Sequence, residues 1–150
     1  MSNRSTHLVV GTPTGLVVAG YLARNERPAA FAVETAGGAI GATLGALGPD
    51  LAEPALHSWH RSTAHSYAAA AVILATTAQA IPRWQDYCRA QAQSHNEARA
   101  RATRDAARLF HGFMAFLWHF LSGFVAGLPA GYLSHLALDS FTPRGIPLVA

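Results

Sequence analysis

Residues 37–45 read Gly-Gly-Ala-Ile-Gly-Ala-Thr-Leu-Gly. This glycine-rich run follows no strand pattern and precedes no nucleotide-binding motif, so we do not expect a phosphate loop. In apolar helices, small residues let neighbouring backbones approach closely. The run therefore indicates a helix that packs tightly against another helix.

Apolar segments of the same kind extend along the chain on both sides of this run. The stretches without Asp, Glu, Lys or Arg are 5–23, 35–49, 62–82 and 109–138, and a membrane-spanning helix needs about 20 mainly apolar residues. No segment keeps a strand-like alternation for long. We therefore predict an all-α compact bundle forming a single domain over 1–150. Its apolar, membrane-embedded helices are expected near 8–22, 30–48, 65–81 and 109–139, with a polar helix near 84–108 inside a polar insert over 83–108.

The composition supports a membrane location. Hydrophobic residues make up 51% of the chain and charged residues 13%, whereas soluble domains carry about 25% charged residues. The single cysteine, Cys88, excludes an intrachain disulfide and a cluster of thiolate ligands. The apolar run after the polar N-terminus is interrupted by Thr12-Pro13-Thr14, so a cleavable signal peptide is not expected.

The basic residues, all of them arginine, predict an orientation in the membrane. If the four apolar helices span, eight arginines lie on the side of residues 23–29 and 82–108, and three lie on the other side. Cytoplasmic loops favour positive charge, so the first side is predicted to be cytoplasmic. Only Trp84 and Tyr87 are interspersed with the arginines of 83–108, so no nucleic-acid partner is expected.

The same topology gathers histidines and acids at the opposite, non-cytoplasmic side. Gly48-Pro49-Asp50 is expected to end a helix, and Ser62 to cap the next helix, with His65 in its first turn. Three histidines and two acids lie within this short region of a chain with little charge: Asp50, Glu53, His57, His60 and His65. We favour a metal site over the alternative that these are ordinary polar loop residues.

Two further segments could complete such a site. In His135-Leu-Ala-Leu-Asp139 the two polar residues are four positions apart and share one helix face, so they could bind one metal ion or pair with each other. An ionisable pair at the end of a long apolar segment is a candidate for function. His7, at the start of the first apolar helix, is the remaining candidate at this side.

Four motifs resemble the LexA-regulated, inner-membrane-associated, metal-dependent hydrolases of bacteria. In chain order they are Thr-His-Leu-Val-Val-Gly at 6–11, Gly-Pro-Asp-Leu-Ala-Glu-Pro at 48–54, His-Arg-Ser-Thr-Ala-His-Ser at 60–66, and the segment from Gly131 to Leu148. They span nearly the whole chain, and the last is the most specific. The resemblance implies a metal site in a membrane helical bundle and a hydrolase activity.

The resemblance also implies a set of metal ligands. The matching positions are His7, Asp50, His60, His65, His135 and Asp139. Many members carry a second aspartate two residues after the first, where this chain has Ala52. Glu53, one position further, could substitute for it.

Histidine nitrogens and carboxylate oxygens suit Zn²⁺, with Mn²⁺ or Fe²⁺ as alternatives. We expect metal-activated water to attack an ester or phosphoester, with Glu53 or Asp139 as the catalytic base. Arg61 and Arg144 are the expected contacts to an anionic, small or lipid-like substrate. The expected environment is membrane lipid, and a homo-oligomer is compatible with the sequence. The alternatives are a non-enzymatic metal-binding membrane protein, structural or transporting, and a soluble helical interaction protein.

Overall fold

The structure, a computed structural model, describes residues 4–53, 63–142 and 145–149. Its described part holds four helices and no strand: α1 (Arg4–Leu22), α2 (Pro28–Ala52), α3 (Tyr67–Arg101) and α4 (Asp105–Ser140). The predicted all-α bundle is therefore confirmed. That residues 1–150 form a single domain stays a prediction.

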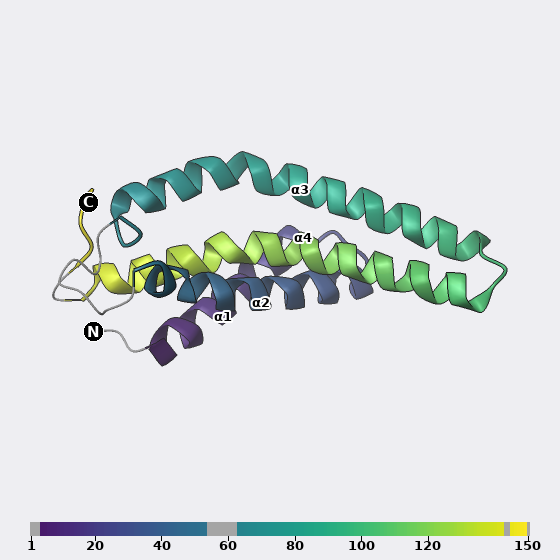
Figure 1. Ribbon diagram of the computed structural model, residues 1–150, viewed down its shortest axis with the longest axis horizontal. Helices are drawn as coiled ribbons and strands as arrows, with labels where there is room; N and C mark the ends of the chain where they lie inside the picture. The colour runs from purple at the N-terminus through teal and green to yellow at the C-terminus, as the bar shows by residue number, and fades with distance from the viewer. Residues whose placement is uncertain (1–3, 54–62, 143–144, 150) are drawn as a thin grey trace.

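The separate polar helix predicted near 84–108 is wrong. Residues 67–101 form one continuous helix, α3, which passes through Pro82, and only three residues separate Arg101 from the start of α4. A proline inside a helix removes one backbone hydrogen bond and bends the helix without having to end it. Figure 1 shows α3 as a long helix that bends along its length.

Each of the four helices contains one internal proline: Pro13, Pro49, Pro82 and Pro129. The expected end of a helix at Pro49 is therefore also wrong, since α2 continues to Ala52 and the Glu53 N–H donates to the Pro49 carbonyl. Internal prolines are characteristic of membrane helices, where neighbouring groups satisfy the freed backbone. The extra turn of α2 places Asp50 on a helix rather than in a loop.

Both ends of the chain lie at the same end of the bundle (Figure 1). α1 and α3 run away from this end, and α2 and α4 run toward it, so α2 and α4 are parallel neighbours. α3 and α4 extend beyond α1 and α2 at the opposite end and are joined there by a short turn.

Glycines form the contact between α2 and α4. On α2 they are Gly37, Gly41 and Gly45, and on α4 they are Gly123, Gly127 and Gly131. A methyl group on any of the six would overlap a backbone carbonyl oxygen of the facing helix; for Gly41 this is the oxygen of Phe124, and for Gly127 that of Gly38. The close packing predicted for residues 37–45 is confirmed, and the α2–α4 backbones touch over three turns.

The bundle has small residues inside and large apolar residues outside. Its buried apolar side chains are alanines, Cys88 and Leu136, whereas Val9, Val72 and Leu109 are 70%, 62% and 75% exposed. In a membrane, lipid covers large apolar side chains and helices associate through small ones. An apolar surface of this extent in water would mark an interaction site or an aggregation hazard.

Two helices, α2 and α4, are long and apolar enough to cross a membrane, against the four expected. Both run toward the same end of the bundle, and α3 joins the end of α2 to the start of α4. If α2 and α4 both cross the bilayer, α3 must cross it in the opposite direction, although α3 is not among the helices whose length and composition alone indicate a membrane span.

A buried ion pair joins the helices far from the chain termini. Glu34 of α2 is fully buried, and its carboxylate accepts hydrogen bonds from Arg89 of α3 at 2.7 Å and from Ser122 of α4 at 3.1 Å. His119 Nδ1 lies 2.9 Å from the same carboxylate, and Arg89 also donates to the Leu22 carbonyl at the end of α1. One carboxylate thus connects all four helices.

The glycine contact predicts a position-specific response to one added methyl group. Gly41→Ala should lower the free energy of unfolding by about 1–3 kcal/mol, because the methyl group would press on the Phe124 backbone. Gly20→Ala is the matched control, since a methyl group there meets its nearest atom at 3.5 Å. Thermal unfolding in detergent measures both. Equal stability of the two variants would contradict this account of α2–α4 packing.

The Glu34 network predicts that removing the charge of Arg89 alone destabilises the fold more than removing the charges of both Arg89 and Glu34. Arg89→Met should cost about 3 kcal/mol, because it leaves the Glu34 carboxylate buried without its cation. Adding Glu34→Gln should restore part of that loss, while Arg83→Met, at an exposed position of the same helix, should change stability by less than about 0.5 kcal/mol. A double variant no more stable than Arg89→Met would show that the pair is not coupled.

Candidate metal centre

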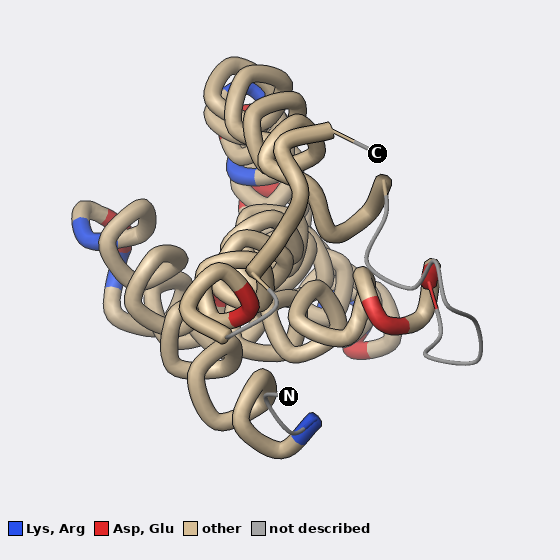
Figure 2. The backbone as a smooth tube through the Cα atoms, turned by 90° about the vertical axis from the view of Figure 1, so that its left-hand side faces the viewer, with Lys and Arg blue, Asp and Glu red and all other residues tan. Residues whose placement is uncertain are grey.

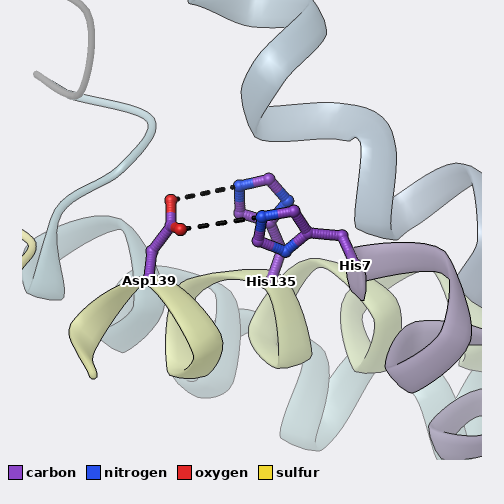
Figure 3. Close-up of side chains that lie close together, drawn as sticks. All are labelled: His7, His135 and Asp139. Atoms are coloured by element: carbon purple, nitrogen blue, oxygen red, sulfur yellow. Dashed lines mark ion pairs between the residues drawn. The ribbon is translucent and has the colours of Figure 1, made fainter. Parts of the chain in front are cut away.

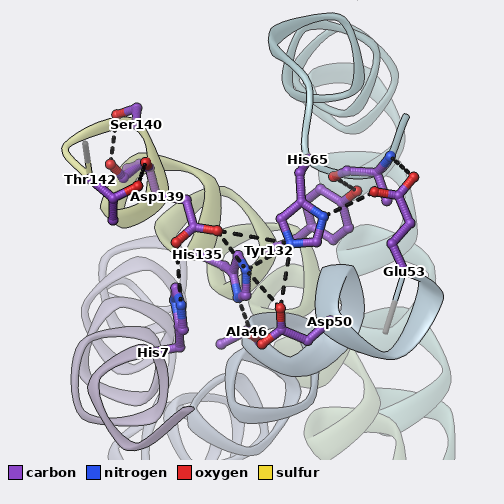
Figure 4. Close-up of polar contacts among 12 residues, drawn as sticks. His7, Ala46, Asp50, Glu53, His65, Tyr132, His135, Asp139, Ser140 and Thr142 are labelled. Carbon is purple, nitrogen blue, oxygen red and sulfur yellow. Dashed lines mark hydrogen bonds and ion pairs between the residues drawn. The ribbon is translucent and has the colours of Figure 1, made fainter. Parts of the chain in front are cut away.

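Four side chains from three separate parts of the chain converge at the end of the bundle where the termini lie (Figure 4). His135 and Asp139 come from the last turns of α4, Asp50 from the last turn of α2, and His65 from the residues just before α3. The Nε2 atoms of His65 and His135 are 3.3 Å apart. Asp50 Oδ1 lies 3.4 Å from the first and 3.6 Å from the second.

Asp139 lies on the other side of the two imidazoles. Its Oδ2 atom is 3.5 Å from His135 Nε2 and 3.9 Å from His65 Nε2. His135 and Asp139 are four residues apart, so the helix itself places them together, as the sequence predicts.

His135 is oriented by a hydrogen bond from its other ring nitrogen. Its Nδ1 atom lies 2.7 Å from the backbone carbonyl oxygen of Ala46, on α2. A carbonyl only accepts, so Nδ1 carries the proton and Nε2 presents its lone pair toward His65, Asp50 and Asp139. This is the tautomer that a metal ligand requires.

His65 is held in the same way by a carboxylate. Its Nδ1 atom lies 3.1 Å from Glu53 Oε2, while Glu53 Oε1 accepts the backbone N–H of Ala64 at 2.9 Å. Both oxygens of Glu53 are thus directed at His65 and its neighbour. Glu53 therefore fixes the position and the tautomer of His65.

The chain around His65 is tied to the rest of the protein. Ser66, not Ser62, is the residue that caps α3: its hydroxyl accepts the N–H of Ala69 at 3.1 Å. The N–H groups of Tyr67 and Ala68 donate to the carbonyls of Pro147 and Leu148, so the C-terminal segment satisfies the first turn of α3. The hydroxyl of Tyr132 donates to the Ala64 carbonyl at 2.6 Å.

His7, from the first turn of α1, lies on the far side of His135. Its ring stacks on that of His135 with centroids 3.7 Å apart and an angle of 11° between the planes. Its Nε2 atom is 3.6 Å from Asp139 Oδ1, so Asp139 faces His7 with one oxygen and His65 and His135 with the other (Figures 3 and 4).

The site is buried except at Asp50. The side chains of His65 and His135 are fully buried and that of Asp139 is 2% exposed, whereas that of Asp50 is 40% exposed. In the view along the bundle from this end, acidic segments lie at helix ends that face the viewer (Figure 2). Among the described residues of the site, Asp50 is therefore the one that solvent reaches.

The sequence prediction and the structure agree on where most of the site lies. Five of the six predicted ligands gather in one cluster: His7, Asp50, His65, His135 and Asp139. The sixth, His60, and the expected substrate contacts Arg61 and Arg144 lie outside the described residues, as does His57. The sequence did not reveal the Ala46 carbonyl as partner of His135, nor that Glu34 is buried.

Two sets of three side chains lie close enough together to hold a metal ion: His7, His135 and Asp139, and Asp50, His65 and His135. A regular tetrahedron with about 2.0–2.1 Å from centre to corner, as for Zn²⁺ with nitrogen and oxygen ligands, has edges of about 3.4 Å. The His65–His135 Nε2 pair and the distances from these atoms to Asp50 Oδ1 and Asp139 Oδ2 are 3.3–3.9 Å, close to such an edge, while the two carboxylates belong to different sets. The Nδ1 atom of each imidazole also lies within hydrogen-bond distance of an oxygen, of Ala46 for His135 and of Glu53 for His65, as is typical of metal-bound histidines.

The whole chain, residues 1–150, matches the family model described as YdjM inner membrane protein. The chain belongs to this family. An inner-membrane protein agrees with the two helices able to span and with the apolar exterior of the bundle. It argues against the alternative of a soluble interaction protein. No curated protein and no solved structure gives a significant match to the chain.

The contact between Glu53 and His65 predicts a measurable effect on metal affinity. Glu53→Gln should weaken binding of Zn²⁺ by about 10–100-fold, because the amide cannot hold the His65 tautomer as the carboxylate does. Competition with a chromophoric chelator measures this in detergent-purified protein. Glu97→Gln, which removes an exposed carboxylate at the other end of the bundle, is the control. Equal affinity in both variants would mean that Glu53 does not orient a ligand.

Proposed function

We propose that the protein is a metal-dependent hydrolase of the inner membrane, with its site at the non-cytoplasmic surface. The observation that carries the proposal is the convergence of two imidazole nitrogens and two carboxylate oxygens, with the other ring nitrogen of each imidazole held by the Ala46 carbonyl or by Glu53. The favoured ion is Zn²⁺, with Mn²⁺ or Fe²⁺ as alternatives.

A hydrolytic metal site needs an open side, and Asp50 supplies it. Among the described candidate ligands Asp50 is the exposed one, so a substrate would enter beside it while His65 and His135 would hold the ion from the buried side. The ion would supply Lewis acidity, lowering the pKa of water toward about 7 and polarising the bond to be cleaved.

A side chain of the protein can accept the proton that the attacking water loses. Hydrolysis joins the water oxygen to the substrate carbon or phosphorus and breaks the bond to the leaving oxygen, which takes up a proton. Asp139 Oδ1 is the proposed acceptor of the water proton, because it faces away from the two buried imidazoles toward His7 Nε2 at 3.6 Å. Glu53, the other base expected from the sequence, is engaged with Ala64 and His65, and we propose it as a positioning residue.

The proposed substrate is an ester or phosphoester, small or lipid-like, presented at the membrane surface. The support is the position of the site at the end of apolar helices and the class of chemistry that such ions catalyse. Contacts to the substrate by Arg61 and Arg144, control by LexA and a homo-oligomeric state remain predictions.

The second candidate is a metal that only stabilises the fold. It is favoured by the complete burial of His65 and His135, since a closed four-ligand site is typical of structural zinc. Such an ion would fasten α2, α4 and the start of α3 together. Metal retention without turnover, together with unfolding of ligand variants, would favour this candidate over the hydrolase.

The test is metal content and hydrolysis in the same preparations. Detergent-purified wild type should hold about one Zn²⁺, Mn²⁺ or Fe²⁺ per chain by elemental analysis, or two for a dinuclear site. His135→Ala should lose the metal, whereas Asp50→Asn should lower turnover of nitrophenyl esters and phosphodiesters more than metal content. His95→Ala, at the opposite end of α3, should keep both. Metal-free wild type, or His135→Ala with full metal content, would overturn the metal site itself.

A further inference from the structure

A basic groove lies at the opposite end of the bundle from the metal centre. It occupies about 760 Å³ between the start of α2, the end of α3 and the start of α4. Arg27, Arg99 and Arg108 line it, together with Asn96 and His119. Arg27 directly precedes α2, Arg99 lies on α3 and Arg108 lies on α4.

The charged residues that line the groove are all basic. None of its lining residues is an aspartate or glutamate. The carboxylates nearby, Glu26, Asp86 and Glu97, line an adjoining hollow instead, where Glu26 pairs with Arg89 at 3.2 Å. Among the described residues, Arg27, Arg99 and Arg108 take part in no ion pair. Their positive charge is therefore available to a ligand.

Helical spacing places the groups on a common wall. On α4, Arg108, Gly112 and Ala115 follow at intervals of four and three residues and share one face. Gly112 leaves room for Arg99, whose guanidinium carbon would lie 3.4 Å from a methyl group at that position. Arg108 is anchored by its Nε, which donates to the Ala102 carbonyl at 2.9 Å, so its terminal N–H groups remain to bind another acceptor.

The groove is apolar toward the body of the bundle. Val33 and Phe116 line it beyond the arginines, and Phe113 and Leu109 on the same helix are 61% and 75% exposed. A free inorganic anion would use only the polar end. An amphiphile with an anionic head and hydrocarbon chains would use both.

The distance along α4 places the groove at the second membrane surface. His119 and Asp139 are twenty residues apart, which is about 30 Å of helix and matches the hydrocarbon thickness of a bilayer. Arg108 lies further still from the metal centre. The arginine-rich end is also the one expected on the cytoplasmic side, where anionic lipids attract basic segments.

We propose that this groove binds one anionic phospholipid of the cytoplasmic leaflet. The headgroup phosphate is held by the guanidinium groups of Arg27, Arg99 and Arg108, which can bind phosphate oxygens in pairs. The acyl chains lie along Val33 and Phe116. The site is separate from the metal centre and does not depend on its activity.

Native mass spectrometry of the full chain in detergent tests this. Titration with dioleoyl phosphatidylglycerol should give one saturating adduct, and dioleoyl phosphatidylcholine should bind markedly less. The triple variant Arg27→Gln/Arg99→Gln/Arg108→Gln should bind phosphatidylglycerol at least tenfold more weakly, since one basic side chain at a membrane surface contributes about fivefold in affinity. The control Arg83→Gln/Arg101→Gln/Arg104→Gln removes the same charge at exposed positions outside the groove and should bind like wild type.

Three outcomes would overturn the proposal. One is equal binding of the two lipids by wild type, and another is an equal loss in both triple variants, which would indicate nonspecific attraction to positive charge. The third is displacement of the lipid by inorganic phosphate at submillimolar concentration, which would make the free ion the ligand. The single variant Arg99→Glu should also weaken phosphatidylglycerol binding, and its unfolding temperature shows whether the fold is kept.

Discussion

The backbone contact between α2 and α4 sets the positions of the other features. Two helices that touch through glycine cannot slide along each other without driving side chains into the facing backbone. The facing positions recur at a constant offset: the Glu34 carbonyl lies at Gly123, the Gly38 carbonyl at Gly127 and the Ala42 carbonyl at Gly131. One turn further, at the same separation of 89 residues, the Ala46 carbonyl lies at His135 Nδ1. The next turn holds Asp50 and Asp139. The register that glycine enforces is therefore the register that brings the candidate metal ligands together.

The same register places a polar group at each end of the apolar contact. At one end, Glu34 is buried against Arg89 and Ser122, and at the other, His135 is buried against Ala46 and His65. Buried ionisable groups are costly in a membrane unless they are paired. In both sets the partners come from segments that are far apart in the sequence. Polar pairing thus fixes helix order and position, while glycine and alanine provide the close approach.

The sequence was informative where chemistry is local. Glycine content indicated close helix packing, the spacing of His135 and Asp139 placed both on one face, and the resemblance to a membrane family gave the ligand set. It failed where the outcome depends on a partner distant in the chain. Pro49 and Pro82 are helix breakers by local rules, yet α2 and α3 continue through them because one lost hydrogen bond is a small fraction of a long packed helix. The pairing of Glu34 with Arg89, and of Glu53 with His65, likewise needs the folded chain, since each partner lies on another segment.

We propose that helix ends brought into register by glycine hold one metal ion through nitrogen and oxygen ligands. X-ray absorption at the zinc edge, on detergent-purified protein reconstituted with Zn²⁺, tests it most directly. The account predicts four nitrogen or oxygen neighbours at about 2.0–2.1 Å, with outer-shell scattering from two imidazole rings and no sulfur at about 2.3 Å. A spectrum with six oxygen neighbours and no imidazole scattering would show a hydrated ion bound elsewhere, and would contradict the account.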